Sequence, residues 1–333
     1  IILLSLFGLG TDYLIQAWAP SVAWLFLGRL IAGIMGASLT TANAYIADVS
    51  TPETRARNYG LAGVAFGLGF IFGPALGGLL GGINLRLPFI MAAILALINW
   101  LYGFFVLPES LTADLRSSLS WQKLNPLTSI LRLRNYPLVA GLSVAVIFTS
   151  LAQRGLESVW VLYTGFRYGW NEQTNGFTLA LVGVMAVIVQ GLILKPTISH
   201  LGERRTIVLG LVVSMIAFFA YGMAAEGWIV LIIIIAGSLS GVALPAIQSL
   251  VAGSISPSEQ GAVQGALTSL ISLTSVFAPL IFTTGLFSFF TSDRTPLLLP
   301  GAPFYLGSFL FLISLIVLSR IFRNHPNTPI NET

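Results

Sequence analysis

The feature that most constrains this chain is a series of apolar stretches, each about as long as a helix that crosses a lipid bilayer. A spanning helix needs about 20 mostly apolar residues, and it satisfies its backbone hydrogen bonds internally. Ten stretches meet this length, separated by segments that carry Pro, Gly, Asn, Asp and charge. The predicted spans are 1–19, 21–47, 58–80, 86–107, 137–165, 174–199, 205–224, 227–252, 261–288 and 301–323. The sequence therefore predicts an all-α polytopic membrane protein.

The charge content supports lipid as the solvent. Only 8% of the 333 residues are charged, whereas a soluble domain carries about 25%. The net charge of +4 comes without a dense basic run, so we expect no nucleic-acid partner. With no cysteine and two histidines, we expect neither a metal site nor a cofactor.

Basic residues indicate how the chain is oriented in the bilayer. If the loop at 48–57 is cytoplasmic, eleven basic residues fall inside, three fall outside and two lie within spans, which accounts for all 16 Lys and Arg. Cytoplasmic loops carry the excess of Lys and Arg. We therefore expect the C-terminus to be cytoplasmic.

An internal repeat at an offset of 205 residues indicates two related halves. The pairs in register are Ala47 with Ala252, Pro52 with Pro257, Gly60 with Gly265 and Pro74 with Pro279. The same offset implies two further helices before residue 1, so we expect a truncated first bundle. The predicted organisation is an N-terminal bundle at 1–107 with four of six helices, a cytoplasmic linker at 108–136, a six-helix bundle at 137–323 and a cytoplasmic tail at 324–333.

A glycine-rich pattern of the form GxxxGPxxGG lies in the predicted span 58–80. Small residues allow close helix contact in lipid, and a proline inside a helix removes one hydrogen bond. Helix packing alone is the alternative explanation for such a pattern. The residues of the pattern are Gly69, Gly73, Pro74, Gly77 and Gly78.

This pattern resembles the antiporter motif of proton-coupled drug exporters of the major facilitator superfamily. The stretches Gly28 to Gly33, Ala44 to Asp48 and Thr54 to Arg57 also resemble the tetracycline/proton antiporters. The resemblance implies two six-helix bundles in a bacterial inner (plasma) membrane. It further implies a monomer that exports a drug-like or tetracycline-like molecule in exchange for protons. The stretch Leu209–Tyr221 lacks the acid of the ninth helix in tetracycline pumps, which argues against tetracycline itself.

Two charged residues in the first two predicted spans are candidates for proton coupling. A charge at the centre of a membrane helix costs about 2.5–3.5 kcal/mol on insertion scales, so it usually faces a bundle interior or an aqueous cavity. Asp12 is predicted either to bind the coupled proton or a substrate cation, or to be a buried hydrogen-bond partner between helices. Arg29 is predicted either to stabilise an ionised acid on a neighbouring helix or to anchor the helix near the outer surface.

A second group of polar residues lies in the other half. Arg154 and Glu157 are three residues apart on one helix face. They are predicted either to neutralise one another or to line the substrate cavity. Gln153 and Gln190 are further candidates for that cavity.

The loop charges Asp48, Arg55 and Arg57 are predicted to form a cytoplasmic gate, with solvated topology signals as the alternative. No nucleotide-binding loop or metalloprotease motif occurs, so we expect a transporter that is not an enzyme. The alternatives are a major facilitator carrier for a sugar, peptide or other metabolite, and a truncated remnant that does not transport.

Overall fold

The computed structural model describes residues 2–35, 41–42, 45–46, 49–108, 137–254, 260–292, 295 and 297–324. Within these ranges every regular element is helical and no strand occurs. The all-α prediction is therefore confirmed. The chain divides by its internal contacts into two units, one made of Ile1–Leu119 and Asn171–Ala180, the other of Ser120–Trp170 and Leu181–Thr333.

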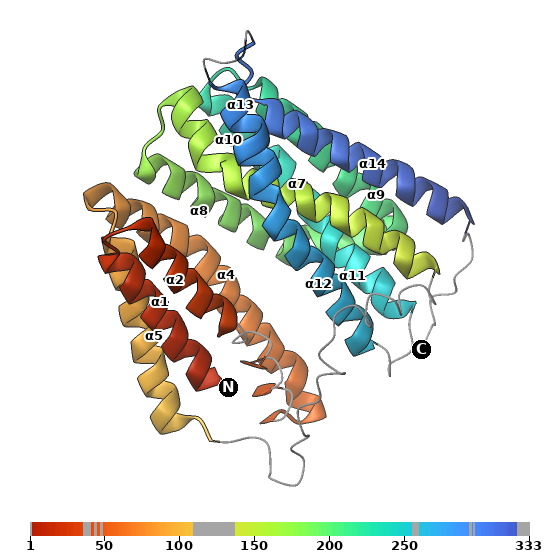
Figure 1. Ribbon diagram of the computed structural model, residues 1–333. Helices are drawn as coiled ribbons and strands as arrows, with labels where there is room; N and C mark the ends of the chain where they lie inside the picture. The colour runs from red at the N-terminus through yellow and green to blue at the C-terminus, as the bar shows by residue number, and fades with distance from the viewer. Residues whose placement is uncertain are drawn as a thin grey trace. The chain divides into compact units, whose positions relative to one another are not determined.

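The first unit is built around a short helix that buries one of its faces. Its helices are α1 (Ile2–Trp18), α2 (Val22–Ile34), α4 (Pro52–Ile83) and α5 (Leu87–Val106). Helix α1 packs against both α2 and α5, and α4 packs against α5 (Figure 1). The face of α1 toward its neighbours is small or polar, since Gly8, Gly10 and Asp12 are all buried.

The second unit has an apolar core between long helices. The helical segments are α7 (Pro137–Tyr168), α8 (Glu172–Ile188), whose first part belongs to the other unit, η3 (Val189–Ile193), α9 (Leu194–Met223), α10 (Gly227–Gly237), η4 (Ser238–Val242), α11 (Ala243–Gly253), α12 (Gln260–Ala278), η5 (Pro279–Phe287), α13 (Ser288–Phe290) and α14 (Ala302–Asn324). Helix α14 packs on α7 and α9, and α12 packs on α7 (Figure 1). Large side chains such as Tyr163, Phe282 and Phe304 are fully buried between these helices.

Side chains from the end of α7 bind the carbonyl groups that the end of α9 leaves free. The Tyr163 hydroxyl donates to the Tyr221 carbonyl at 2.6 Å. The Tyr168 hydroxyl and Arg167 Nε both donate to the Ala224 carbonyl at 2.8 Å. Since the last carbonyls of a helix have no partner inside it, these bonds fix α9 to α7.

The helices follow the predicted spans where the structure describes them. Among the described residues six helices are long and apolar enough to cross a membrane, and shorter apolar helices occupy Ile2–Trp18, Val22–Ile34 and Gly67–Ile83. One of the six, Glu172–Met223, has 52 residues, which is enough for two crossings of about 20 residues each. Gly202 breaks it with φ 74° and ψ 164°. The break falls between the predicted spans 174–199 and 205–224.

Three helical stretches of the second unit depart from the α-helical hydrogen-bond pattern part-way along their length. The η3 and η5 segments are π-helical, and η4 is a 3₁₀ helix. Pro279 begins η5, and a proline has no N–H to continue the α-helical bonding. Such segments often occur at functional sites, and Gln190 lies in η3.

Most of the predicted linker and tail lie outside the described residues, as do the repeat partners Ala47 and Pro257. The predicted domain limits at 107, 136 and 323 therefore stay a prediction.

Candidate functional site

A carboxyl group is buried in the centre of the first unit. Asp12 on α1 has a side chain that is 0% exposed. Neither of its carboxyl oxygens has a hydrogen-bond partner. The predicted alternative of a hydrogen-bond partner between helices is therefore not observed among the described residues. Burial of a charge without hydrogen bonds is costly, so the groups nearest to this carboxyl group bear directly on what it can do.

Arg29 on α2 is the cation nearest to this acid among the described residues. Its Nη2 lies 3.9 Å from Asp12 Oδ2, which is within ion-pair range but too long for a hydrogen bond. The Arg29 side chain is 60% exposed. The arginine therefore lies close to the acid, and its predicted roles, as a partner of an ionised acid or as an anchor near the outer surface, stay predictions.

The guanidinium group of Arg29 has a different hydrogen-bond partner. Arg29 Nη2 donates to Oε1 of Gln16, which lies one turn after Asp12 on α1. The Gln16 side chain is 8% exposed, and its Nε2 has no hydrogen-bond partner. Sequence reasoning missed Gln16, although its spacing of four residues from Asp12 places both on one helix face.

Gly28 provides the space that the buried carboxyl group occupies. A Cβ atom added to Gly28 would lie 2.5 Å from Asp12 Oδ1 and 3.5 Å from the Asp12 carbonyl oxygen. The glycine next to Arg29 therefore allows α2 to contact α1 at the acid.

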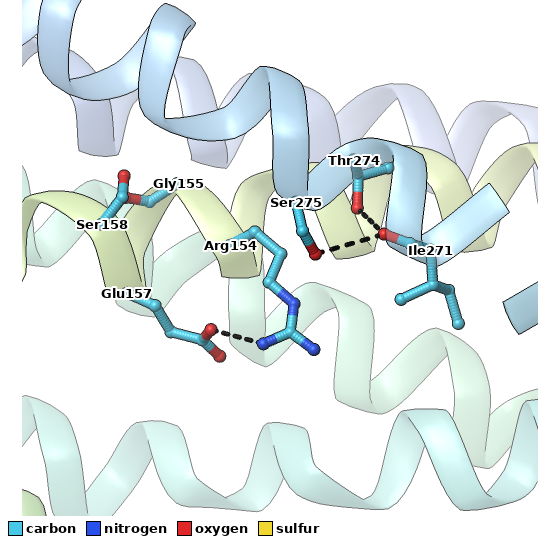
Figure 2. Close-up of polar contacts among 7 residues, drawn as sticks. All are labelled: Arg154, Gly155, Glu157, Ser158, Ile271, Thr274 and Ser275. Atoms are coloured by element: carbon cyan, nitrogen blue, oxygen red, sulfur yellow. Dashed lines mark hydrogen bonds and ion pairs between the residues drawn. The ribbon is translucent and has the colours of Figure 1, made fainter. Parts of the chain in front are cut away.

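In the second unit, Arg154 and Glu157 form an ion pair on α7 (Figure 2). Arg154 Nη1 donates to Glu157 Oε2 at 2.7 Å, and the two side chains are 45% and 47% exposed. The predicted pairing is thus observed. A guanidinium group has five N–H donors and a carboxylate has two oxygens, so both partners keep capacity to bind a polar ligand.

The surroundings of this pair combine hydroxyl groups with a tight helix contact. Thr274 and Ser275 on α12 both donate to the Ile271 carbonyl, at 2.6 Å and 3.4 Å (Figure 2). Further along the same helix, the ring of Phe282 from η5 packs where a Cβ on Gly155 would stand, 2.3 Å away. The turn of α7 that carries the pair is therefore held firmly.

The remaining predicted site residues are not brought into either cluster. Gln153 and Gln190 are exposed on α7 and η3. Asp48 lies outside the described residues, as do the side chains of Arg55 and Arg57. The roles predicted for these five residues in the cavity and the gate stay predictions.

The glycine-rich pattern lies in α4, and one of its residues makes close contact. A Cβ on Gly78 would lie 2.7 Å from the Cα of Gly176 on α8. Gly69, Gly73 and Gly77 have nothing within 4 Å of the corresponding position. The small residue is therefore required for close packing at Gly78.

The described residues contain no group of three His, Asp or Glu side chains that could hold a metal ion. The described residues instead form a set of apolar helices with a buried acid in one unit and an ion pair in the other. Such a fold and such intramembrane charges define a multi-pass membrane transporter.

Comparison with known proteins defines the family. The family model described as Major Facilitator Superfamily matches residues 1–279 and 142–332. The chain belongs to the major facilitator superfamily, which confirms the predicted fold class and resemblance. It is 33% identical over 320 residues to a tetracycline resistance protein of class C from Escherichia coli, covering 96% of this chain and 79% of that protein. It is 36% identical over 323 residues to the class G protein from Vibrio anguillarum, covering 97% and 80%.

Solved structures show the same fold. The human organic anion transporter MFSD10 matches with a TM-score of 0.67 and 26% identity, covering 95% of this chain and 76% of that one. The nucleoside transporter NupG matches with a TM-score of 0.73 and 14% identity, covering 96% and 82%. At 14% identity the second match concerns the fold alone.

Proposed function

We propose that the chain exports a drug-like small molecule in exchange for protons across the bacterial inner membrane. The observation that supports this most is the buried Asp12, which has no hydrogen bond and has Arg29 within 3.9 Å. An acid that alternates between a neutral buried form and an ionised form near arginine can carry a proton through a transport cycle. The tetracycline resistance proteins at 33–36% identity support a drug as the exported molecule.

In the proposed cycle, protons move inward and the drug moves outward. Two six-helix bundles open alternately to the two sides of the membrane around a central cavity. Arg154 and Glu157 contribute a polar patch to that cavity, with Gln153 and Gln190 as further contacts. The protein acts as a monomer. Its C-terminus is cytoplasmic, as the distribution of basic residues indicates. Asp48, Arg55 and Arg57 belong to the cytoplasmic gate.

A drug-stimulated proton flux tests this proposal. The protein is expressed from its complete coding sequence, and inside-out vesicles are prepared with an acidic interior. Tetracyclines and other amphiphilic drugs are added while a fluorescent dye reports the internal pH. We expect a rise in internal pH on addition of a transported drug, and we expect Asp12→Asn to abolish it.

One result would change the role of Asp12, and another would count against drug export. Proton flux that survives in Asp12→Asn would retain antiport but remove Asp12 from it. No response to any drug, with the protein shown to be folded in the membrane, would favour a carrier for a sugar, peptide or other metabolite.

A further inference from the structure

The contacts of Arg29 show a choice between two acceptors on the same face of α1. Gln16 Oε1 accepts a hydrogen bond from Arg29 Nη2, while the same nitrogen lies 3.9 Å from Asp12 Oδ2. Both acceptor side chains are buried, at 8% and 0% exposure. A small movement of the half-exposed guanidinium group would therefore exchange one acceptor for the other.

The acceptor that Arg29 takes depends on the charge of Asp12. A hydrogen bond to a charged group contributes about 1.5–3 kcal/mol, whereas a typical neutral one contributes about 0.5–1.5 kcal/mol. An ionised carboxylate at this distance would therefore bind the guanidinium group in preference to a neutral amide. In the observed arrangement the Gln16 amide holds Arg29, and both carboxyl oxygens of Asp12 lack a donor.

We propose that Gln16 is a positioning residue that holds Arg29 while Asp12 is protonated and releases it when the proton leaves. In the release step, the O–H bond of the Asp12 carboxyl group breaks and its proton passes to a water molecule on the cytoplasmic side. The electron pair stays on the carboxylate, and Arg29 moves from the amide to that carboxylate. This inference rests on the proposed proton-coupled export and adds a residue to it.

Among the charged and amide side chains described around this site, the exchange involves Asp12, Gln16 and Arg29. Helices α2 and α5 are the elements packed against α1 among the described residues. Arg29 is the one charged residue of α2, and α5 has none between Leu87 and Val106. The other titratable groups on these three helices are the phenols of Tyr13 and Tyr102.

Removing the amide of Gln16 and replacing it with a carboxylate should shift the pH midpoint of drug-stimulated proton flux in opposite directions. In Gln16→Met, Arg29 loses its alternative acceptor and stays with Asp12, so the ionised acid is favoured. The pH midpoint of drug-stimulated proton flux should then move to lower pH. In Gln16→Glu, a second carboxylate keeps Arg29 away and repels the ionised form of Asp12. The midpoint should then move to higher pH.

The control is a nearby polar residue that does not contact Arg29. The Thr11 hydroxyl donates to the Phe7 carbonyl of its own helix at 2.8 Å, so Thr11→Val should leave the midpoint unchanged. An infrared difference spectrum gives a second readout at pH 7. The band of the protonated carboxyl group, identified by its loss in Asp12→Asn, should weaken in Gln16→Met and persist in Gln16→Glu.

Each result decides the role of Gln16. Opposite shifts of the two variants would support the exchange. Midpoints that stay in place, or that move in the same direction, would overturn it, as would a fall in flux that is equal at every pH. If Asp12→Asn keeps the full drug-stimulated flux, Asp12 does not couple the proton. That result contradicts the proposed function at this acid, whatever the Gln16 variants show. If a variant does not insert, the other variant and its infrared band still give the direction of the shift.

Discussion

Gly28 and Asp12 fit against each other so closely that no side chain larger than hydrogen is accommodated between them. A Cβ at position 28 would stand 2.5 Å from Asp12 Oδ1, well inside the normal contact distance of about 3.5 Å. The carboxyl group is fully buried, so it has little room to withdraw. The residue before Arg29 thus determines where the acid lies relative to the arginine.

Gly28→Ala should displace the Asp12 carboxyl group and reduce drug-stimulated proton flux. The added methyl group overpacks the contact between α1 and α2, which typically costs about 1–3 kcal/mol. The flux is measured in vesicles, and the thermal unfolding temperature in detergent reports the stability.

The matched control for this substitution lies on the same helix. Gly33 has nothing within 4 Å of its Cβ position, so Gly33→Ala should preserve both the flux and the unfolding temperature. Equal behaviour of the two variants would show that the close fit at Gly28 has no consequence.

Gly176→Ala should lower the stability of the contact between α8 and α4. A Cβ at Gly176 would lie 2.6 Å from the Cα of Gly78 and 2.7 Å from the Pro74 carbonyl oxygen. Backbone atoms cannot rotate away, so the helices must separate. Thermal unfolding of the purified protein checks this, with Gly77→Ala as the control because Gly77 has nothing within 4 Å. An unfolding temperature that Gly77→Ala lowers as much would contradict the assignment.

Neutralising Glu157 should impair transport more than stability. The pair with Arg154 is 45% and 47% exposed, and exposed ion pairs contribute about 0–1 kcal/mol. We therefore expect Glu157→Gln to unfold within a few degrees of the unchanged protein and to show a several-fold lower rate of drug uptake.

The double exchange Arg154→Glu with Glu157→Arg separates pairing from ligand contact. It restores the ion pair but reverses its direction along α7, so we expect transport to stay low. Full recovery of drug uptake would show that the residues serve only to neutralise one another.

Gly202→Ala should destabilise the break between the two membrane crossings of α8 to α9. The backbone of Gly202 has φ 74° and ψ 164°, a region that is essentially restricted to glycine, and occupying it costs other residues about 1–3 kcal/mol. The unfolding temperature in detergent should fall, whereas Gly265→Ala on α12, where nothing lies within 4 Å, should have little effect. An unchanged unfolding temperature for Gly202→Ala would mean that the break relaxes without strain.

The spans of the chain were predictable because their cause is local. A helix such as α5 or α14 is recognised from its apolar length, since lipid requires each helix to satisfy its own backbone. Residues 36–40, 43–44 and 47–48, in the later part of the predicted span 21–47 and the loop at Asp48, lie outside the described residues, so the prediction there remains untested. The winding changes at η3, η4 and η5 were not predicted, although Pro279 gave a signal for the last of them.

The candidate site was predictable only in part. Asp12, Arg29, Arg154 and Glu157 stand out because charge is rare in an apolar span. Gln16 and Gly28 do not, since an amide and a glycine are common in membrane helices. The glycine-rich pattern in α4 likewise gave no indication that Gly78 alone would meet another backbone.

The sequence by itself determined that this protein is a bundle of membrane helices of the major facilitator type, and it identified the charges that the membrane makes costly. Only the tertiary structure decided which of those charges meet. Asp12 and Arg29 lie on different helices, and the close contact of α1 with α2 at Gly28 places the arginine between an amide and a carboxyl group. That contact depends on packing between residues of two helices, which no local pattern of residues specifies.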